Sequence, residues 1–353
     1  MDDLNIRIKS FIKLGAFLQE YCEYSNKPMD LIGIKKQWFD EFDQELTLSG
    51  HKNGWHTKEN ILYNLKKWSE LLTESNLNAW LNNYDLGNTS PKKVALILAG
   101  NIPLVGFHDF LSALITGNKV LIKASSNDAV LLPFLVRYLV SVAPSLENEI
   151  SFIEGKLKDY DCVIATGSNN TARYFEHYFG SKPNIIRKSR NSVAVLTGNE
   201  TQEQLFALGE DIFQYYGLGC RSVSKLFVPI DYDFDVFFKA IFPYSSIIDG
   251  IKYSNNYDYN KAVYLMSEFK ILDNGFLILK EDESYASPIA SLFYERYESK
   301  AAVIAKLNKD REKLQCIVAK GITKDETPFG QTQTPSLTDY ADGVDTVEFL
   351  LKT

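Results

Sequence analysis

Two kinds of hydrophobic pattern divide the chain at about residue 90. Before it, apolar side chains recur at helical spacing, as Ile61, Leu65 and Trp68 do, so this part is predicted to be helical. After it, short apolar runs rich in β-branched residues alternate with amphipathic stretches. That alternation predicts an α/β fold in which a parallel sheet is covered by helices on both faces.

The expected elements after the helical part follow from these runs. A loop is expected at LGNTSPKK (86–93), and residues 245–265, rich in Ser, Tyr and Asn, are expected to be irregular. Strands are predicted at 94–99, 120–123, 161–166, 192–196, 225–229, 275–280 and 314–320, and helices at 103–115, 128–142, 171–179 and 201–216.

Bulk composition narrows the class of protein. A chain of 353 residues exceeds what one core usually organises, so either two domains or one domain with a large insertion is expected. The net charge of −7 argues against a nucleic-acid-binding surface. The start MDDLNIRIKSFIKLGAF lacks the apolar core of a signal peptide, and no apolar run is long enough to span a membrane. Four cysteines without paired spacing fit neither a metal site nor a disulfide framework, which predicts a soluble, cytoplasmic protein.

Cys220 is the candidate nucleophile. It lies in YYGLGCRSVSKLFVP, between a predicted helix and a predicted strand, with Gly217 and Gly219 in the intervening loop. A thiol at such a junction can be exposed, and nearby backbone N–H groups can bind an oxyanion. Arg221 is a candidate to stabilise the thiolate. The other three cysteines lie in apolar periodic segments, where cysteine behaves as a small hydrophobe.

Three further elements follow predicted strands, and in an open α/β sheet ligands bind at the carboxyl ends of strands. Asn101 can donate its amide N–H to a developing oxyanion, or can simply cap the helix that Pro103 begins. Lys123 can reach a ribose or phosphate, or can be a solvated surface lysine. The turn Thr166, Gly167 and Ser168 can present N–H groups to a phosphate.

The order and spacing of these four elements resemble the aldehyde dehydrogenase superfamily: Asn-x-Pro after a strand, a strand-end Lys, a Thr-Gly-Ser turn, then the cysteine. ESYASPIASLFYE (283–295) is similar to that superfamily's Glu-x-Phe-Gly-Pro segment, which implies that Glu283 binds the cofactor ribose and that Tyr285 is the aromatic contact. TPFG (327–330) resembles its closing segment. The usual dinucleotide glycine fingerprint is absent, so the cofactor must be held differently.

Within the superfamily the chain resembles the acyl-CoA reductase family, which includes the reductase subunit of the bacterial bioluminescence fatty-acid reductase. The residues that carry this likeness are LAGNIP, GLGCRS and the tail PFGQTQTPSLTDYADGVDTVEFLL. Oxidising aldehyde dehydrogenases have an upstream glutamate that activates water, whereas the corresponding stretch here, PNIIRKSRNS (183–192), has no carboxylate. Without that base the acyl-enzyme is expected to be exchanged with a thiol or reduced, which favours acyl-CoA chemistry.

The cofactor preference is predicted from Ser126. Many NAD-preferring superfamily members have a glutamate at this position, and its absence removes repulsion against a 2′-phosphate, which Lys123 would attract. NADPH is therefore expected, with NADH as the alternative. No metal site is expected, and His108 and His177 are expected to be structural.

The resemblance implies an aldehyde-dehydrogenase-like fold: a helical N-terminus and Rossmann-type cofactor domain (1–196), an α/β catalytic domain (197–325) and a closing segment (326–353), with the active site in the cleft between domains. It implies NADPH-dependent reduction of an acyl thioester, of long-chain acyl-CoA or an acyl carrier, to the aldehyde. The expected assembly is a homo-oligomer with an acyl-transfer or synthetase partner. Two alternatives stay open: an acyltransferase or thioesterase that uses Cys220 without hydride transfer, and a non-catalytic scaffold of a lipid-synthesis complex.

Overall fold

The computed structural model describes residues 3–27, 32–87 and 90–353, so residues 88 and 89 of the expected loop lie outside the described part. The chain divides into two compact units. Unit 1 contains residues 1–188 together with 336–353, and unit 2 contains residues 189–335. The division falls at Lys188/Ser189, before the predicted strand 192–196, because that strand pairs into the sheet of unit 2. The expected closing segment is likewise shared: its first part belongs to unit 2, and residues 336–353 belong to unit 1.

Unit 1 is built on a five-stranded parallel sheet in the order β3-β2-β1-β4-β5. Its strands are β1 (Lys93–Ile97), β2 (Lys119–Lys123), β3 (Ile150–Phe152), β4 (Cys162–Thr166) and β5 (Asn184–Arg187). The pleat sends successive side chains to opposite faces, and both faces are buried. Leu96 packs into the large core on one face, while Ala95 packs on the other face, against Phe175 and Phe179. The predicted two-sided parallel sheet is therefore confirmed.

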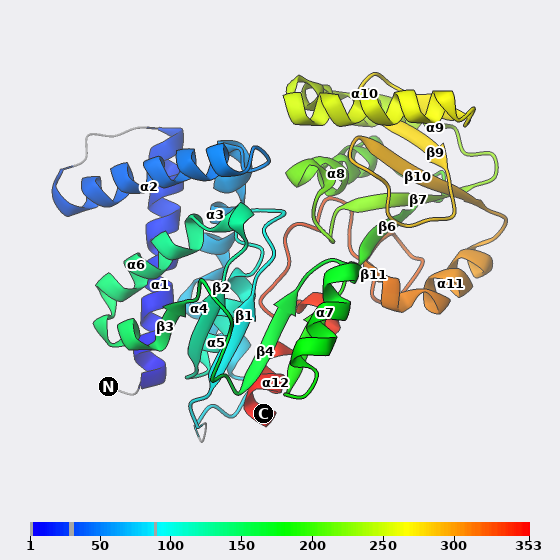
Figure 1. Ribbon diagram of the computed structural model, residues 1–353. Helices are drawn as coiled ribbons and strands as arrows, with labels where there is room; N and C mark the ends of the chain where they lie inside the picture. Colours follow the sequence, from blue (N-terminus) through cyan, green and yellow to red (C-terminus); the bar gives the residue numbers. More distant parts are fainter. Residues whose placement is uncertain (1–2, 28–31, 88–89) are drawn as a thin grey trace. The chain divides into compact units, whose positions relative to one another are not determined.

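Helices cover both faces of this sheet (Figure 1). On one face α7 supplies Phe175 and Phe179, and on the other α5 shares the large core with the N-terminal helices. The C-terminal helix α12 packs against α5. The helices of unit 1 are α1 (Asp3–Asn26), α2 (Gly33–Lys52), α3 (Lys58–Leu71), α4 (Glu74–Leu81), α5 (Phe107–Ile115), α6 (Leu131–Val142), α7 (Asn169–Phe179) and α12 (Thr346–Lys352).

Hydrogen bonds attach the C-terminal tail to the N-terminal helical part of unit 1. Tyr84 donates to Asp345 (2.7 Å), and the Trp80 indole N–H donates to the Tyr340 hydroxyl (2.7 Å). The His108 ring lies 3.0 Å from the Leu337 carbonyl, which agrees with the structural role expected for this histidine. The last part of the tail that resembles the acyl-CoA reductase family (336–353) is thus hydrogen-bonded to the helical part of unit 1.

Unit 2 is built on a six-stranded sheet in the order β11-β6-β7-β10-β9-β8, parallel except for the β8–β9 pair. Helices α8 and α9 pack on one of its faces, and α11 packs on the other. The strands are β6 (Asn191–Val195), β7 (Val223–Pro229), β8 (Ile271–Asp273), β9 (Ile278–Glu281), β10 (Ser291–Tyr297) and β11 (Leu314–Val318). The helices are α8 (Gln202–Phe213), α9 (Phe234–Ile241), α10 (Ile251–Met266) and α11 (Lys300–Lys309).

Three expectations about local structure are wrong, and one of them is the helix start at residue 103, since that helix begins at Phe107. Residues 245–265 are largely helical. Helix α10 buries Tyr253, Tyr257 and Tyr264 on one face. Most of its other residues are polar, so the sequence shows no clear helical periodicity of apolar residues. The helix expected from residue 128 begins at Leu131, after a separate 3₁₀ turn, η1 (Ser126–Asp128).

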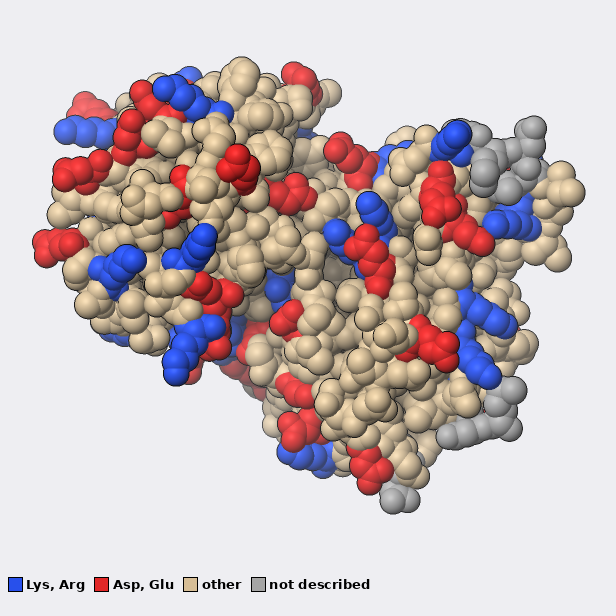
Figure 2. Space-filling model, turned by 180° about the vertical axis from the view of Figure 1, so that it is seen from behind, with Lys and Arg blue, Asp and Glu red and all other residues tan. Residues whose placement is uncertain are grey.

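On the face drawn in Figure 2, lysine and arginine side chains are interspersed with aspartate and glutamate. None of the helices in the described ranges is both long and apolar enough to cross a membrane.

Candidate functional site

In unit 1 the predicted cofactor and oxyanion residues come together at one edge of the sheet. Strands β2, β1 and β4 are neighbours and parallel, so their carboxyl ends lie side by side. Lys123 ends β2, Asn101 follows β1, and Thr166 ends β4. The sheet topology therefore gathers three segments that are far apart in the sequence at one edge of the sheet, the edge at which open α/β sheets bind ligands.

Asn101 is exposed and does not cap a helix. Helix α5 begins at Phe107, with Gly106 at its N-cap and no side-chain cap, because residues 103–106 form a turn in place of the expected helix start. The interpretation of Asn101 as the cap of this helix is thus wrong.

The loop after β1 is held at two backbone positions. Leu104 has a left-handed backbone (φ 54°) and donates its N–H to Oδ2 of Asp128 (2.8 Å). The Gly100 carbonyl accepts from Nδ2 of the buried Asn53 (3.2 Å). Gly100 also lies so close to the next loop that an added Cβ would come within 2.7 Å of the Ser125 hydroxyl oxygen.

The remaining candidates in unit 1 supply donors. Lys123 is exposed and its ammonium donates to the Gly155 carbonyl (3.2 Å), while Ser126 is exposed in η1. Ser168 is the N-cap of α7 and accepts from the Thr171 N–H, and Gly167 precedes it in the turn. An ammonium, hydroxyls and a helix N-terminus at one edge suit the phosphates and ribose hydroxyls of a dinucleotide.

Cys220 is the exposed member of the four free cysteines, and the other three are buried. Its carbonyl accepts a hydrogen bond from the Ser192 hydroxyl (2.9 Å), and that hydroxyl in turn accepts from the Cys316 N–H (3.1 Å). Ser192 lies on β6 and is fully buried, so it connects the Cys220 loop to two strands of the sheet. The Arg221 guanidinium donates to the Cys316 sulfur (3.6 Å).

The backbone just before Cys220 is strained. Tyr215, Tyr216 and Gly217 are successive left-handed residues, with φ of 54°, 57° and 74°. Left-handed non-glycine residues cost about 1–3 kcal/mol each and concentrate at functional sites. Helix α8 is thereby ended sharply, and the chain is redirected into the loop that exposes the thiol.

The Glu283–Tyr285 segment, between β9 and β10, is held by β7. The Lys225 ammonium donates to the Glu283 carbonyl (2.7 Å) and to Glu295 (2.7 Å), and the Ser224 hydroxyl donates to the Tyr285 carbonyl (2.7 Å). The Lys225 side chain is fully buried. Burial lowers the pKa of its ammonium group, and the Glu295 carboxylate raises this pKa in part. Glu283 is exposed.

Tyr285 itself is buried. Its side chain is only 9% exposed, and its hydroxyl donates to Asp310 (2.8 Å). Its ring lies under the Lys225 ammonium, 5.1 Å from the nitrogen. Little of the ring is therefore available to a ligand.

The resembled closing segment is anchored by Asp211 on α8. This fully buried carboxylate accepts from the Gly330 N–H (2.7 Å) and from the N–H and hydroxyl of Thr332 (2.9 and 2.8 Å). Burial raises its pKa to about 6, and these hydrogen bonds oppose the rise. The Gln333 amide donates to Ser222 (3.3 Å), which connects the same segment to the Cys220 loop.

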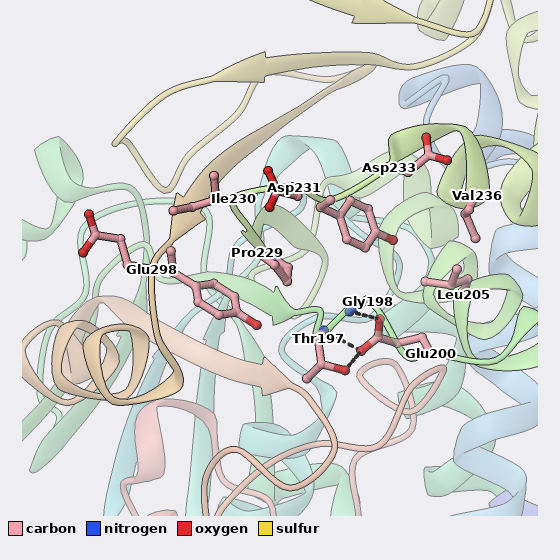
Figure 3. A pocket seen from close by; sticks show the side chains of 12 residues that line it. Thr197, Gly198, Glu200, Leu205, Pro229, Ile230, Asp231, Asp233, Val236 and Glu298 are labelled. Carbon is pink, nitrogen blue, oxygen red and sulfur yellow. Dashed lines mark hydrogen bonds between the residues drawn. The ribbon is translucent and has the colours of Figure 1, made fainter.

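A separate pocket of about 510 Å³ lies at the carboxyl ends of β6, β7 and β10 (Figure 3). Four carboxylates line it, and Glu200 among them accepts from the backbone of Thr197 and Gly198. Cys220 precedes the amino end of β7, a strand of seven residues, so the pocket and the thiol lie about 20 Å apart along it. The pocket is therefore distinct from the Cys220 loop. The carboxylates are Glu200, Asp231, Asp233 and Glu298.

Sequence reasoning missed the residues that hold these loops. A lysine inside the apolar run KLFVP was a visible signal for Lys225. Asp128 and Ser192 carried no signal, because their role depends on which loops and strands become neighbours. Asn53 lies in the helical part that offered no motif.

Comparison with known proteins identifies related sequences. A family model described as acyl-CoA reductase (LuxC) matches residues 24–236. The long-chain acyl-protein thioester reductase 2 of Photobacterium leiognathi is 26% identical over 250 residues, which cover 65% of this chain and 51% of that protein. The long-chain acyl-protein thioester reductase of Aliivibrio fischeri is 25% identical over 241 residues, covering 57% and 49%. The chain thus spans about half the length of these curated relatives.

Solved structures show the same fold. An aldehyde dehydrogenase of Bacillus cereus in complex with NAD⁺ aligns with 92% of this chain and 73% of its own, with a TM-score of 0.64 and 13% identity. An indole-3-acetaldehyde dehydrogenase in complex with NAD⁺ aligns with 95% and 75%, with a TM-score of 0.63 and 13% identity. The predicted aldehyde-dehydrogenase-like α/β fold with a helical N-terminal segment is confirmed.

Proposed function

Because the chain belongs to the acyl-CoA reductase (LuxC) family, we propose that it reduces an acyl thioester to an aldehyde with NADPH, through an acyl group carried on Cys220. The observation that carries the proposal is the difference in solvent exposure among the four cysteines. Cys220 is exposed on a loop whose backbone is hydrogen-bonded to the sheet, whereas Cys22, Cys162 and Cys316 are buried. Burial raises the pKa of both Cys22 and Cys162 to about 11, which makes these thiols poor nucleophiles.

The proposed chemistry begins with attack of the Cys220 thiolate on the thioester carbonyl. A new sulfur–carbon bond forms, the bond to the donor sulfur breaks, and the donor thiolate leaves and takes up a proton. The Asn101 amide and the Cys220 N–H donate to the oxyanion that forms in between. The pairing of Asn101 with Cys220 is part of the proposal and is supported by the family resemblance.

A nicotinamide, when bound, would supply a hydride. Addition of this hydride to the acyl carbon, with a proton taken up by the oxygen from solvent, leaves a thiohemiacetal on Cys220. Collapse of the thiohemiacetal breaks the carbon–sulfur bond, releases the aldehyde and restores the thiol. Lys123, Ser126 and the Thr166–Ser168 turn are proposed to hold the phosphates and adenosine ribose, and Glu283 the other ribose. Tyr285 is proposed to support Glu283, since its own ring is largely buried.

NADPH is proposed over NADH because Ser126 is exposed and carries no charge that would repel a 2′-phosphate, while the Lys123 ammonium is close in sequence and at the same sheet edge. The names of the two curated relatives support a long-chain acyl group, and they also support an acyl group carried by a protein as an alternative to acyl-CoA. A homo-oligomer and an acyl-transfer or synthetase partner remain part of the proposal.

The experiment that tests the proposal measures thioester-dependent NADPH oxidation with acyl-CoA esters of several chain lengths, for the wild type and for Cys220→Ala. Cys316→Ala is the matched control, because Cys316 is also a free cysteine of unit 2 but is buried. The expected result is oxidation that Cys220→Ala abolishes and that Cys316→Ala largely preserves.

Other results would redirect the assignment. Acylation of Cys220, detected by mass spectrometry, without NADPH oxidation would indicate an acyltransferase or thioesterase. An unmodified Cys220 with CoA and carrier-protein thioesters would contradict the reductase proposal and favour the scaffold. Substitution Ser126→Glu is expected to shift the ratio of kcat/KM values from NADPH toward NADH by about tenfold or more, since it introduces a charge that repels the 2′-phosphate.

A further inference from the structure

We propose that Asp128 is a positioning residue for the proposed reaction: its buried carboxyl group holds the loop that carries Asn101 in the conformation needed to stabilise the oxyanion. The inference rests on the proposed function, because it assigns a role to Asp128 only through Asn101. Both residues belong to unit 1.

The first support is a hydrogen bond between two loops that follow neighbouring strands. Asp128 ends η1, after β2, and its Oδ2 accepts from the N–H of Leu104, which follows β1 (2.8 Å). Leu104 lies three residues beyond Asn101 and has a left-handed backbone (φ 54°). Such a conformation is costly for leucine and persists only where its surroundings impose it, and the Asp128 contact is a direct restraint on that peptide.

The second support is the burial of the carboxyl group. Asp128 is only 8% exposed, and its other oxygen, Oδ1, is buried without a hydrogen-bond partner among the described residues. Burial raises the pKa of Asp128 to about 7, and the Leu104 N–H lowers it in part. Burying a carboxyl group with one unpartnered oxygen is unfavourable, and the one hydrogen bond given for this side chain goes to the Asn101 loop.

The third support is that the loop is held from its other side as well. The Gly100 carbonyl accepts from Asn53, whose own Oδ1 accepts from the Trp55 N–H (3.1 Å). Asn101 therefore lies between two restrained peptides, one at Gly100 and one at Leu104. Misplacing a catalytic donor by about 1 Å can slow a reaction by about 10²-fold, so restraint at both ends has a kinetic consequence.

The test is a double-mutant cycle on the rate of Cys220 acylation. Release of the CoA thiol from dodecanoyl-CoA is followed in a single turnover without NADPH, in wild type, Asp128→Ala, Asn101→Ala and the double variant. Asp128→Ala is expected to slow acylation by about 10- to 100-fold in wild type but by less than about twofold when Asn101 is absent, because residues that act as one unit are not additive. Asp128→Asn keeps an acceptor oxygen and is expected to remain within about threefold of wild type.

Two readouts separate positioning from a general loss of structure. Alkylation of Cys220 by iodoacetamide needs no oxyanion donor, so Asp128→Ala is expected to leave its rate unchanged. Leu139→Ala truncates a fully buried side chain on α6, so it destabilises the same unit while leaving the hydrogen bonds of Asp128 and Asn53 to the Asn101 loop in place, and it is expected to leave acylation at the wild-type rate. Hydrogen exchange of the peptide that contains Leu104 is expected to increase in Asp128→Ala and not in Leu139→Ala.

The outcomes that overturn the inference are specific. Wild-type acylation in Asp128→Ala, multiplicative effects in the cycle, or equal slowing of acylation and alkylation would each reject a positioning role. If Asp128→Ala does not fold, Asp128→Val, which likewise lacks an acceptor oxygen, takes its place in the cycle, and additivity with Asn101→Ala would then reject the inference. If the wild type is not acylated at all, both the proposed function and this inference are rejected. If the wild type is acylated and Asp128→Ala is acylated at the same rate, the inference is rejected and the proposed function is retained.

Discussion

The loop that carries Asn101 and the loop that carries Cys220 both follow a sharp change of chain direction, and both contain left-handed non-glycine residues. They are held differently. In unit 1 the Asn101 loop is held by the carboxyl group of Asp128 and the amide of Asn53, which come from other segments. In unit 2 the Cys220 loop is held by the Ser192 hydroxyl. The first loop is therefore held directly by an ionisable group and the second directly by a neutral one, which predicts that pH acts more strongly on the first.

The largest effect is expected at Asn101. Asn101→Ala removes one proposed oxyanion donor and should slow acylation of Cys220 by about 10²- to 10³-fold, while alkylation of the thiol is unchanged. Thiol release from an acyl-CoA in a single turnover measures it. Asn255→Ala, an exposed change on α10, is the control. Equal acylation by Asn101→Ala and wild type would show that the first loop has no part in the chemistry.

The next largest effect is expected at Lys225, whose ammonium group holds the Glu283–Tyr285 segment in unit 2. Lys225→Met leaves the Glu283 carbonyl without this donor and removes one of the two ammonium groups that donate to Glu295, so unfolding of the unit should be easier by about 2–3 kcal/mol. Urea unfolding measures it. Lys306→Met removes the half-exposed partner of the same glutamate and should cost less than about 1 kcal/mol. Equal losses from the two variants would contradict the anchoring role of Lys225.

A smaller effect is expected in the pH dependence of the free energy of unfolding, which should change with the charge of Asp128, the residue that holds the Asn101 loop. Burial raises the pKa of Asp128 from 3.8 to about 7, so the folded state binds this proton more tightly than the unfolded state. Stability from this group is therefore present below pH 3.8 and is lost as the pH rises through about 7. Between pH 5 and pH 7 the difference in unfolding free energy between Asp128→Asn and wild type should change by about 2 kcal/mol in favour of the variant.

Urea unfolding at the two pH values measures this difference, and taking it against wild type cancels the other carboxylates. Asp211 is the matched group in unit 2, where burial likewise raises the pKa, to about 6, with Glu210 contributing. A pH-independent difference for Asp128→Asn would show that its carboxyl group is not the ionisable anchor described above.

The smallest effect is expected at Ser192. Ser192→Ala removes the hydrogen bonds to the Cys220 carbonyl and from the Cys316 N–H, which should cost about 1 kcal/mol of stability and slow acylation only a few-fold. The left-handed turn at Tyr215–Gly217 remains to direct the loop. A loss of acylation as large as that of Asn101→Ala would show that the hydroxyl, and not the turn, places Cys220.

Much of the site could be read from local sequence. The strand-end positions of Asn101, Lys123 and Thr166 follow from apolar runs bounded by polar residues, and the exposed thiol at Cys220 follows from its glycine-flanked loop. Both patterns involve only residues that are close in the sequence, so they can be recognised without knowledge of the fold. The helix at Ile251–Met266 was missed because tyrosines form its buried face, and tyrosine is as common in loops and strands as in helices.

The sequence by itself determined the fold class, the parallel strands and the nucleophile candidate, because each depends on periodicity or on neighbours along the chain. Only the tertiary structure decided that strand β6 belongs to unit 2, that the tail is shared between the units, and that Asp128, Asn53, Ser192 and Lys225 hold the loops. The physical reason is the same for all of them. A buried polar group is placed by the partner it must satisfy, and that partner becomes its neighbour only when the chain has folded.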